Sequence, residues 1–213
     1  MMPVKVSHRA LAPLAVVLAV TVFGIGALSY WWRDRANLAK SSARLAAAET
    51  RMWEAYYRRD GEALARELMV VVRGQFGLSE ESAHEIARHM AHAAGTFELL
   101  RDADYERTVL PELEQAYELL KRKSGRLFDA HEAARAELAW WIARRKHGLD
   151  EVNEVGAQIA RLYGILFGGE TPGIKLAAAL RAKASYLRDT NDNWAEVQHL
   201  LEESYRVLLS TTR

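Results

Sequence analysis

The stretch DEVNEVGAQIARLYGILFGGETP, residues 150–172, decides the fold class of this chain. Its apolar residues recur three or four positions apart, which is the period of one face of an α-helix and not the alternation of a strand. Gly168 and Gly169 are expected to end that helix, and Thr171 with Pro172 supplies an N-cap and a first-turn proline for the next one. The stretch therefore predicts two consecutive helices. The apolar face of the first consists of Val152, Val155, Ile159, Tyr163 and Leu166.

The same pattern continues on both sides of this stretch. Apolar residues recur at helical spacing, alternating β-branched runs are absent, and breaks fall at glycine, proline, aspartate or asparagine. We predict an all-α protein in which about seven helices form a compact bundle, with a small solenoid of paired helices as the alternative. The expected breaks are Asp60–Gly61, Gly77, Asp102–Asp104, Pro111, Ser124–Gly125, Gly148, Gly168–Gly169 and Asp192–Asn193.

A membrane anchor is expected near the N-terminus. Residues 10–32 are 23 consecutive residues without a charged side chain. As a helix with a rise of about 1.5 Å per residue they would span about 34 Å, enough for a hydrocarbon core of about 30 Å. We therefore predict a single transmembrane helix over residues 10–32, preceded by a short flank over 1–9. The alternative is a signal peptide cleaved after residues 27–29.

The charges that flank the anchor favour one orientation. Basic residues are more numerous on its C-terminal side, so the positive-inside rule predicts a cytoplasmic helical domain. We expect a juxtamembrane helix over residues 33–60 and a helical domain over 61–213. The basic residues compared are Lys5 and Arg9 before the anchor, and Arg33, Arg35, Lys40 and Arg44 after it.

The juxtamembrane helix carries a seam of large and small residues. Its large residues recur every seven positions and small residues lie between them. Such a seam allows two helices to approach closely, either within one chain or between two chains in a homodimer. The residues of the seam are Leu38, Ser41, Leu45, Ala48, Met52 and Ala55.

Composition excludes several classes of function. The chain has no cysteine, which removes disulfides, thiolate metal sites and thiol nucleophiles. Its 29 Lys and Arg residues balance 28 Asp and Glu residues, whereas nucleic-acid-binding domains usually carry a basic excess. No dinucleotide fingerprint, phosphate-binding loop or nucleophile elbow is present. We therefore expect no nucleic-acid partner and no cofactor.

Two Glu-x-x-His pairs and one histidine row were considered as metal ligands. Glu81 with His84 and Glu196 with His199 have the spacing of di-metal helical bundles, but helical phase places these side chains outward. The row formed by Glu85, His89 and His92 has the spacing i, i+4 and i+7 and contains the remaining metal candidates. No metal site is predicted. His89 lies at the edge of the apolar face, so we expect it to be partly buried and hydrogen-bonded.

Glu137 is the most unusual acidic residue. It lies about 40° from Trp141 within an apolar helix face, and a carboxylate there needs a partner. Arg144 or an arginine of another helix is the expected partner. Glu137 is interpreted either as one member of a buried ion pair or as part of a pocket in which Glu137 and His89 are candidate catalytic groups. The candidate cofactor-binding residues are Trp53, Trp140, Trp141 and Arg144.

These observations lead to one expected function and one alternative. We expect a membrane-anchored, all-helical accessory or scaffolding protein that acts through contact with another protein or with a second copy of itself. The anchor and the missing catalytic motifs support this expectation. The alternative is a helical-bundle enzyme, or a binder of a metal, haem or lipid, that uses a pocket centred on Glu137 and His89.

Overall fold

A computed structural model describes residues 35–101, 104–146, 150–191 and 193–212. The chain divides into two units, Met1–Lys40 and Ser41–Arg213. Of the first unit only residues 35–40 are described, and they are helical. The predicted anchor over residues 10–32 lies outside the described residues. Within the described residues, no helix is both long and apolar enough to cross a bilayer.

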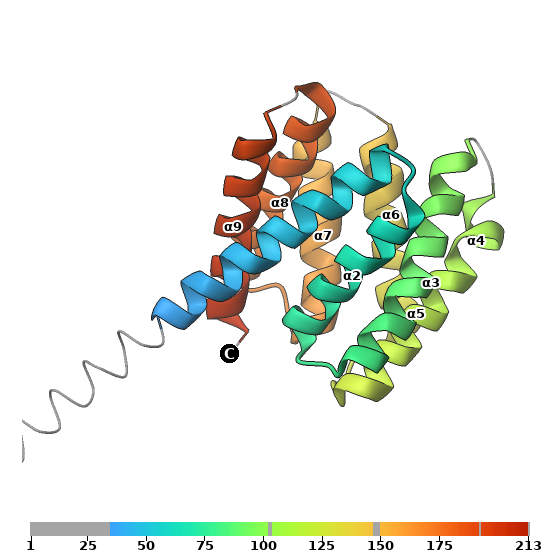
Figure 1. The fold of residues 1–213 in the computed structure, drawn as a ribbon, viewed down its shortest axis with the longest axis horizontal. Helices are drawn as coiled ribbons and strands as arrows, with labels where there is room; N and C mark the ends of the chain where they lie inside the picture. The colour runs from blue at the N-terminus through green and yellow to red at the C-terminus, as the bar shows by residue number, and fades with distance from the viewer. Residues whose placement is uncertain (1–34, 102–103, 147–149, 192, 213) are drawn as a thin grey trace, which may run out of the picture. The chain divides into compact units, whose positions relative to one another are not determined.

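The unit Ser41–Arg213 is all-helical over its described residues, as predicted (Figure 1). The first helix covers residues 41–57 of this unit, so residues 41–60 belong with the compact part of the chain. Eight labelled helices follow. They are α2 Gly61–Phe76, α3 Glu80–Leu99, α4 Tyr105–Thr108, α5 Leu110–Ser124, α6 Ala130–Arg145, α7 Glu151–Phe167, α8 Pro172–Thr190 and α9 Trp194–Thr211.

Each of the longer labelled helices packs mainly on the next one along the chain. The contacts run from α2 to α3, from α3 to α5, and then in order through α6, α7 and α8 to α9. The first helix crosses this array. It contacts α2 so closely that a Cβ on Gly74 would lie 2.8 Å from Cδ2 of Leu45. It also reaches α8 and α9 through Glu49, which binds Arg181 and Tyr205.

Most helix ends follow the local signals in the sequence. Gly77, Gly125 and Gly168 adopt the left-handed conformation after α2, α5 and α7, where glycine carries no steric cost. The Asp129 side chain accepts a hydrogen bond from the Glu132 amide at the start of α6, and Thr171 caps α8 directly before Pro172.

Two helix ends differ from the prediction. The first helix stops before Asp60–Gly61, because Arg59 takes the left-handed conformation with φ 57° and Asp60 instead caps α2. Helix α6 ends at Arg145, three residues before the expected Gly148. At the break expected at Pro111, the short helix α4 ends and α5 begins with the proline in its first turn.

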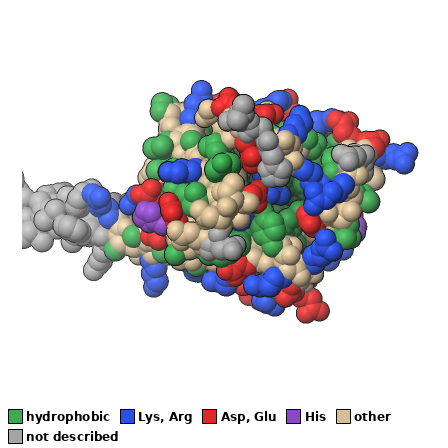
Figure 2. All heavy atoms as spheres, turned by 90° about the horizontal axis from the view of Figure 1, so that it is seen from above, with side chains coloured by type: hydrophobic (Ala, Val, Ile, Leu, Met, Phe, Trp, Pro, Cys, Tyr) green, Lys and Arg blue, Asp and Glu red, His purple; other side chains and the backbone are tan. Residues whose placement is uncertain are grey.

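The core is built largely from small and aliphatic side chains. Leu45, Ala48 and Ala55 of the predicted seam are buried within the unit, which favours the intramolecular interpretation of that seam, while Ser41 is exposed. Glu49 lies on the same face and is fully buried. On the outside, basic and acidic side chains are interspersed with apolar ones over the face shown in Figure 2.

Candidate functional site

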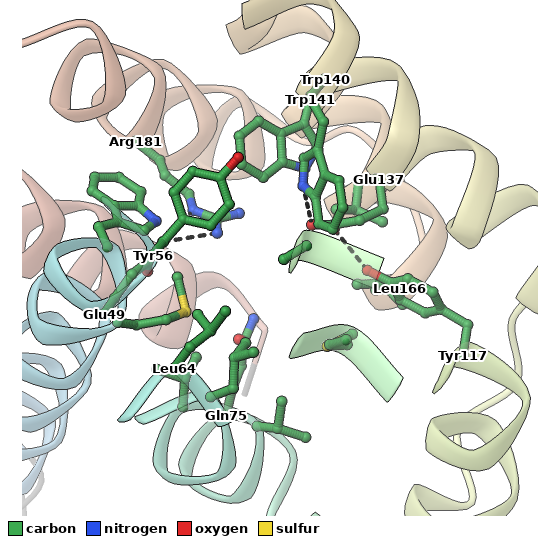
Figure 3. Close-up of a pocket in the computed structure, with 18 of the residues that line it drawn as sticks. Glu49, Tyr56, Leu64, Gln75, Tyr117, Glu137, Trp140, Trp141, Leu166 and Arg181 are labelled. Atoms are coloured by element: carbon green, nitrogen blue, oxygen red, sulfur yellow. Dashed lines mark hydrogen bonds and ion pairs between the residues drawn. The ribbon is translucent and has the colours of Figure 1, made fainter. Parts of the chain in front are cut away.

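A cavity of about 130 Å³ lies inside the bundle (Figure 3). The first helix and helices α2, α3, α5, α6, α7 and α8 all contribute side chains to its wall. Most of these side chains are apolar or aromatic, and five are charged. The charged ones are Glu49, Glu137, Arg144, Arg181 and Arg188.

Helical periodicity places these charged groups on the cavity. On α6, Glu137 and Arg144 are seven residues apart, so two helical turns bring both side chains to one face. Arg181 and Arg188 are related in the same way on α8. On the first helix, Glu49 and Trp53 are one turn apart. Three helices thus each place two side chains on the cavity wall, and at least one of each two is charged.

The first polar network, which we call the Glu49 network, consists of Glu49, Arg181 and Tyr205. Nε of Arg181 donates to Oε1 of Glu49 at 2.8 Å, and Nη2 of Arg181 lies 2.7 Å from the same oxygen. The Tyr205 hydroxyl donates to Oε2 of Glu49 at 2.5 Å. Burial raises the pKa of Tyr205, and the Glu49 charge raises it further. One guanidinium meets one carboxylate here, so the two charges compensate each other.

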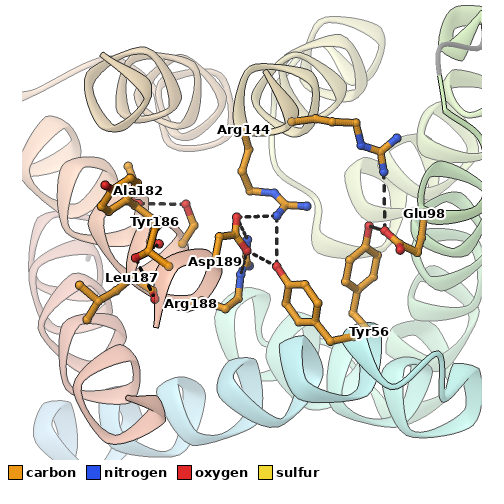
Figure 4. A network of polar contacts seen from close by, with 12 residues as sticks. Tyr56, Glu98, Arg144, Ala182, Tyr186, Leu187, Arg188 and Asp189 are labelled. Carbon is orange, nitrogen blue, oxygen red and sulfur yellow. Dashed lines mark hydrogen bonds and ion pairs between the residues drawn. The ribbon is translucent and has the colours of Figure 1, made fainter. Parts of the chain in front are cut away.

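The second network, which we call the Asp189 network, consists of Arg144, Arg188, Asp189 and Tyr57 (Figure 4). Nη1 of Arg144 donates to Oδ2 of Asp189 at 2.8 Å, and Nε of Arg188 donates to Oδ1 at 3.1 Å. The Tyr57 hydroxyl donates to Asp189 and accepts from Arg144. Burial alone would raise the pKa of Asp189, but the charges of Arg188 and Arg144, with the hydrogen bonds from Arg188 and Tyr57, lower it to about 2.

Glu137 has a different partner from the one expected. Its carboxylate accepts a hydrogen bond from the Tyr117 hydroxyl at 2.8 Å and another from Nε1 of Trp141 at 2.8 Å (Figure 3). Of the two expected partners, Arg144 extends to Asp189 on α8 instead, and no arginine of another helix forms an ion pair with Glu137 among the described residues. Burial and the neighbouring Glu137 charge raise the pKa of Tyr117 well above its ordinary value, so this hydroxyl stays protonated and donates.

Trp140 is buried beside the cavity and its indole N–H has no acceptor within the described residues. A buried donor without a partner carries a desolvation cost of about 1–3 kcal/mol. Its ring also packs against Arg181, whose Cζ lies 5.1 Å from the ring centroid. An unused donor at a cavity wall is a group that a ligand or a water molecule could satisfy.

Tyr56 extends this polar region toward α3. Its hydroxyl donates to Oε2 of Glu98 at 2.8 Å, and burial followed by this bond raises the pKa of Tyr56. Arg145 lies 3.6 Å from the same carboxylate and stacks on Phe97, with its Cζ 3.7 Å from the ring centroid. The adjacent residues Tyr56 and Tyr57 therefore each bind a different carboxylate that also receives an arginine.

The structure brings most of the predicted site residues together. Glu137, Trp140, Trp141, Arg144 and Trp53 all line the single cavity described above. Whether these residues hold a cofactor stays a prediction, because only their common location is observed. Glu137 and His89 do not line the same pocket, because His89 lies with Glu85 at a different hollow.

His89 is partly buried, as expected, and pairs with Glu112. Its Nδ1 lies 2.7 Å from Oε2 of Glu112, and Nδ1 of His92 lies 3.2 Å from Oε1 of the same residue. Glu85 lies at this hollow but not in that pair. Across the part of the chain that the structure describes, no three histidine or acidic side chains are placed to hold a metal ion. The side chains of His84 and His199 are exposed, as helical phase predicts.

Apart from Arg144, the charged residues of the two networks were not predicted as site residues from the sequence. Glu49 follows Leu45 by one turn and precedes Met52 by nearly one, so the phase argument that identified Glu137 also identifies Glu49. Arg181 and Arg188 are recognisable in the same way, since they lie among the buried alanines of α8. Asp189 has no such signal, because its role depends on contacts between helices.

Comparisons with protein-family models, with curated proteins and with solved structures found no match to this chain.

Proposed function

We propose that the unit Ser41–Arg213 is a binding domain for a small, largely apolar molecule that occupies the cavity between its helices. The observation that carries the proposal is the cavity itself, a space of about 130 Å³ inside a helical core. An engineered apolar cavity of about 150 Å³ in another protein is large enough to bind benzene.

The energetic cost of such a space supports the proposal. Unfilled apolar core volume costs a protein about 24 cal/mol per Å³, so apolar atoms that fill a space of about 130 Å³ contribute at most about 3 kcal/mol. That is a large fraction of the 5–15 kcal/mol by which domains are typically stable. A ligand that fills the cavity gains this free energy, and it also contacts Trp140, whose indole N–H has no acceptor among the described residues.

The sequence-based hypothesis of a membrane-anchored scaffold rests on residues outside the described part of the chain. It gives no reason for five charged side chains to line an internal cavity, whereas a binding function does. Ligand pockets are typically apolar with a few polar groups that fix orientation. In our proposal the predicted anchor over residues 10–32 would hold a ligand-binding domain, and not only a docking surface, at the bilayer.

The experiment is thermal unfolding of the full-length chain in detergent micelles with benzene or toluene as neutral probes. A probe at ten times its dissociation constant stabilises the folded state by about 1.4 kcal/mol, which raises the Tm of a domain of this size by about 3–6 °C. The variant Ala94→Leu places three more carbons in the cavity and should lose this response. Its own Tm without probe should rise or stay unchanged.

A matched substitution controls for the added hydrophobic surface and for uptake of the probe by micelles. Ala195 is exposed in the first turn of α9, away from the cavity, so Ala195→Leu should retain the full response. If the original chain and both variants respond equally to the probes, the cavity is not a binding site. The absence of any response in the original chain, for probes of benzene size, would also overturn the proposal.

A further inference from the structure

Arg144 and Arg188 depend on the same acidic residue. Asp189 lies 2.8 Å from Arg144 and 3.1 Å from Arg188, and all three side chains are largely buried, at 13%, 3% and 10% exposure for Arg144, Arg188 and Asp189 (Figure 4). Across the described residues, no second carboxylate lies within 4.0 Å of either guanidinium. The hydroxyl of Tyr57, the other member of the network, is neutral and removes none of the charge.

The Asp189 network therefore has two positive charges and one negative charge, so one positive charge is not compensated. A buried charge without a counter-ion costs several kcal/mol, even after relaxation. Burial followed by the charge of Arg144 lowers the pKa of Arg188, so the surroundings disfavour this guanidinium. Arg181 on the same helix has its own carboxylate, Glu49, and its pKa is raised. Glu137, the remaining carboxylate of the cavity wall, binds Tyr117 and Trp141, and among the described residues it has no ion pair with Arg144 or Arg188, so the excess is specific to the Asp189 network.

Both guanidiniums line the cavity, and together with Asp189 they leave one positive charge uncompensated. Arg188 is held there by aromatic stacking, with its Cζ 4.2 Å from the centroid of Trp53. A guanidinium is planar, and stacking on an aromatic ring fixes the orientation of its plane. Its remaining N–H groups then suit a two-point contact with a planar anion. Apolar side chains such as Leu64, Val72 and Met90 form other parts of the same wall.

From this geometry we infer that the ligand of the cavity is a small apolar monocarboxylate whose carboxylate binds Arg188 and Arg144. The inference rests on the proposed binding function and names the chemical class of its ligand. One carboxylate supplies one negative charge, which is the amount that two arginines and Asp189 lack. A phosphate monoester carries between one and two negative charges near neutral pH and would exceed this deficit. The cavity volume limits the apolar part to about the size of one benzene ring.

The experiment compares three probes of similar shape and different charge. Isothermal titration of the full-length chain in micelles with phenylacetate, phenylacetamide and phenethylammonium separates charge from size. We expect phenylacetate to bind at least about tenfold more tightly than the neutral amide, because charge-assisted hydrogen bonds contribute about 1.5–3 kcal/mol. Phenethylammonium should bind more weakly than both.

Variants assign the preference to Arg188. Arg188→Met should remove the preference for phenylacetate while it retains binding of the amide. Arg188→Lys keeps the charge without the fork and should reduce the preference several-fold, which provides a second test if the methionine variant does not fold. Arg206→Met removes the same charge from an exposed residue on α9 and should leave all three affinities unchanged.

The outcomes separate this inference from the proposed function. Equal affinity for phenylacetate and phenylacetamide, or tighter binding of phenethylammonium, would overturn the carboxylate inference and leave the cavity as a binding site for other molecules. A preference for phenylacetate that persists in both Arg188 variants would overturn the assignment to Arg188. Failure of all three probes would overturn the carboxylate inference, and the absence of a response to benzene would overturn the proposed function.

Discussion

Arg181 and Arg188 lie two turns apart on the same face of α8, but their electrostatic surroundings differ. Arg181 has a carboxylate of its own in Glu49, which a tyrosine hydroxyl also binds. Arg188 must share Asp189 with Arg144. Both arginines line the same cavity and both are largely buried. The difference therefore lies in the number of counter-charges and not in burial.

This comparison separates two uses of buried charge. The Glu49 network connects the first helix to α8 and α9. Its one positive and one negative charge compensate each other, so no excess charge remains for another molecule to bind. The Asp189 network connects the first helix to α6 and α8 but retains one excess positive charge at the cavity wall. Burial alone would classify both networks as structural, whereas counting charges identifies the second one as the place where a ligand anion fits.

The largest difference is expected between the same substitution at the two arginines. Arg181→Met leaves Glu49 buried without a cation, which should lower the free energy of unfolding by about 3–5 kcal/mol. Arg188→Met leaves Arg144 and Asp189 as a one-to-one pair, so the free energy of unfolding should change by less than about 1 kcal/mol. Denaturant unfolding of the full-length variants in micelles measures both values.

The double variant Glu49→Met with Arg181→Met provides the control for this difference. Replacing both charges by apolar groups of similar size should recover most of the loss, because no unpaired charge remains. Equal losses at Arg181 and Arg188 would show that the two networks are electrostatically alike and would remove the basis of the comparison.

An intermediate effect is expected at acidic pH. The pKa of Asp189 is lowered to about 2 in the folded state, whereas an unfolded aspartate has a pKa of about 3.9. A lowered pKa stabilises the folded state above the unfolded value, so this contribution is complete above about pH 5 and is lost as pH falls from about 4 toward 2. Its size is about 2–3 kcal/mol. Denaturant midpoints measured between pH 2 and 6 should show it.

Two asparagine variants isolate this contribution. Asp189→Asn should be less stable at neutral pH and should lose part of the stability change between pH 4 and 2. Asp150→Asn alters an exposed residue outside both networks and should retain that change in full. An unchanged acid profile in the Asp189 variant would contradict the lowered pKa and the strong pairing that it implies.

The smallest difference is expected between the adjacent tryptophans of α6. Nε1 of Trp141 donates to Glu137, while that of Trp140 has no acceptor within the described residues. Tryptophan to phenylalanine removes similar volume at both positions, so the difference between the two losses reports the hydrogen bond. Trp141→Phe should lower the free energy of unfolding by about 1.5 kcal/mol more than Trp140→Phe does. A larger loss at Trp140 would mean that its N–H is bonded in solution.

The helices could be predicted because their signals are local. Ser79, Asp129 and Thr171 cap helices with their own side chains, and Gly77, Gly125 and Gly168 end helices through their own backbone conformation. Arg59 was missed as a helix end because a non-glycine residue rarely takes a positive φ, and its conformation depends on the surrounding fold.

The site could be predicted only in part. Helical phase identified Glu137 as a carboxylate on an apolar face, and applied to the first helix it would also have identified Glu49. Phase shows which way a side chain points but not which helix lies opposite. Arg144 was therefore one of two expected partners of Glu137, although Asp189 of α8 is its partner. His89 was grouped with Glu137 by composition, and only packing separates the two.

The first helix has a further consequence for the order in which the protein forms. Glu49 is 132 residues from Arg181 and 156 residues from Tyr205 along the chain, and Tyr57 is 132 residues from Asp189. A ribosome makes the N-terminal residues first, so the first helix must wait for α8 and α9 before its carboxylate meets a cation. Contacts this distant in sequence form slowly. The wall of the cavity is therefore complete only once α8 has been made, and a chain that stops before α8 lacks both Arg181 and Arg188.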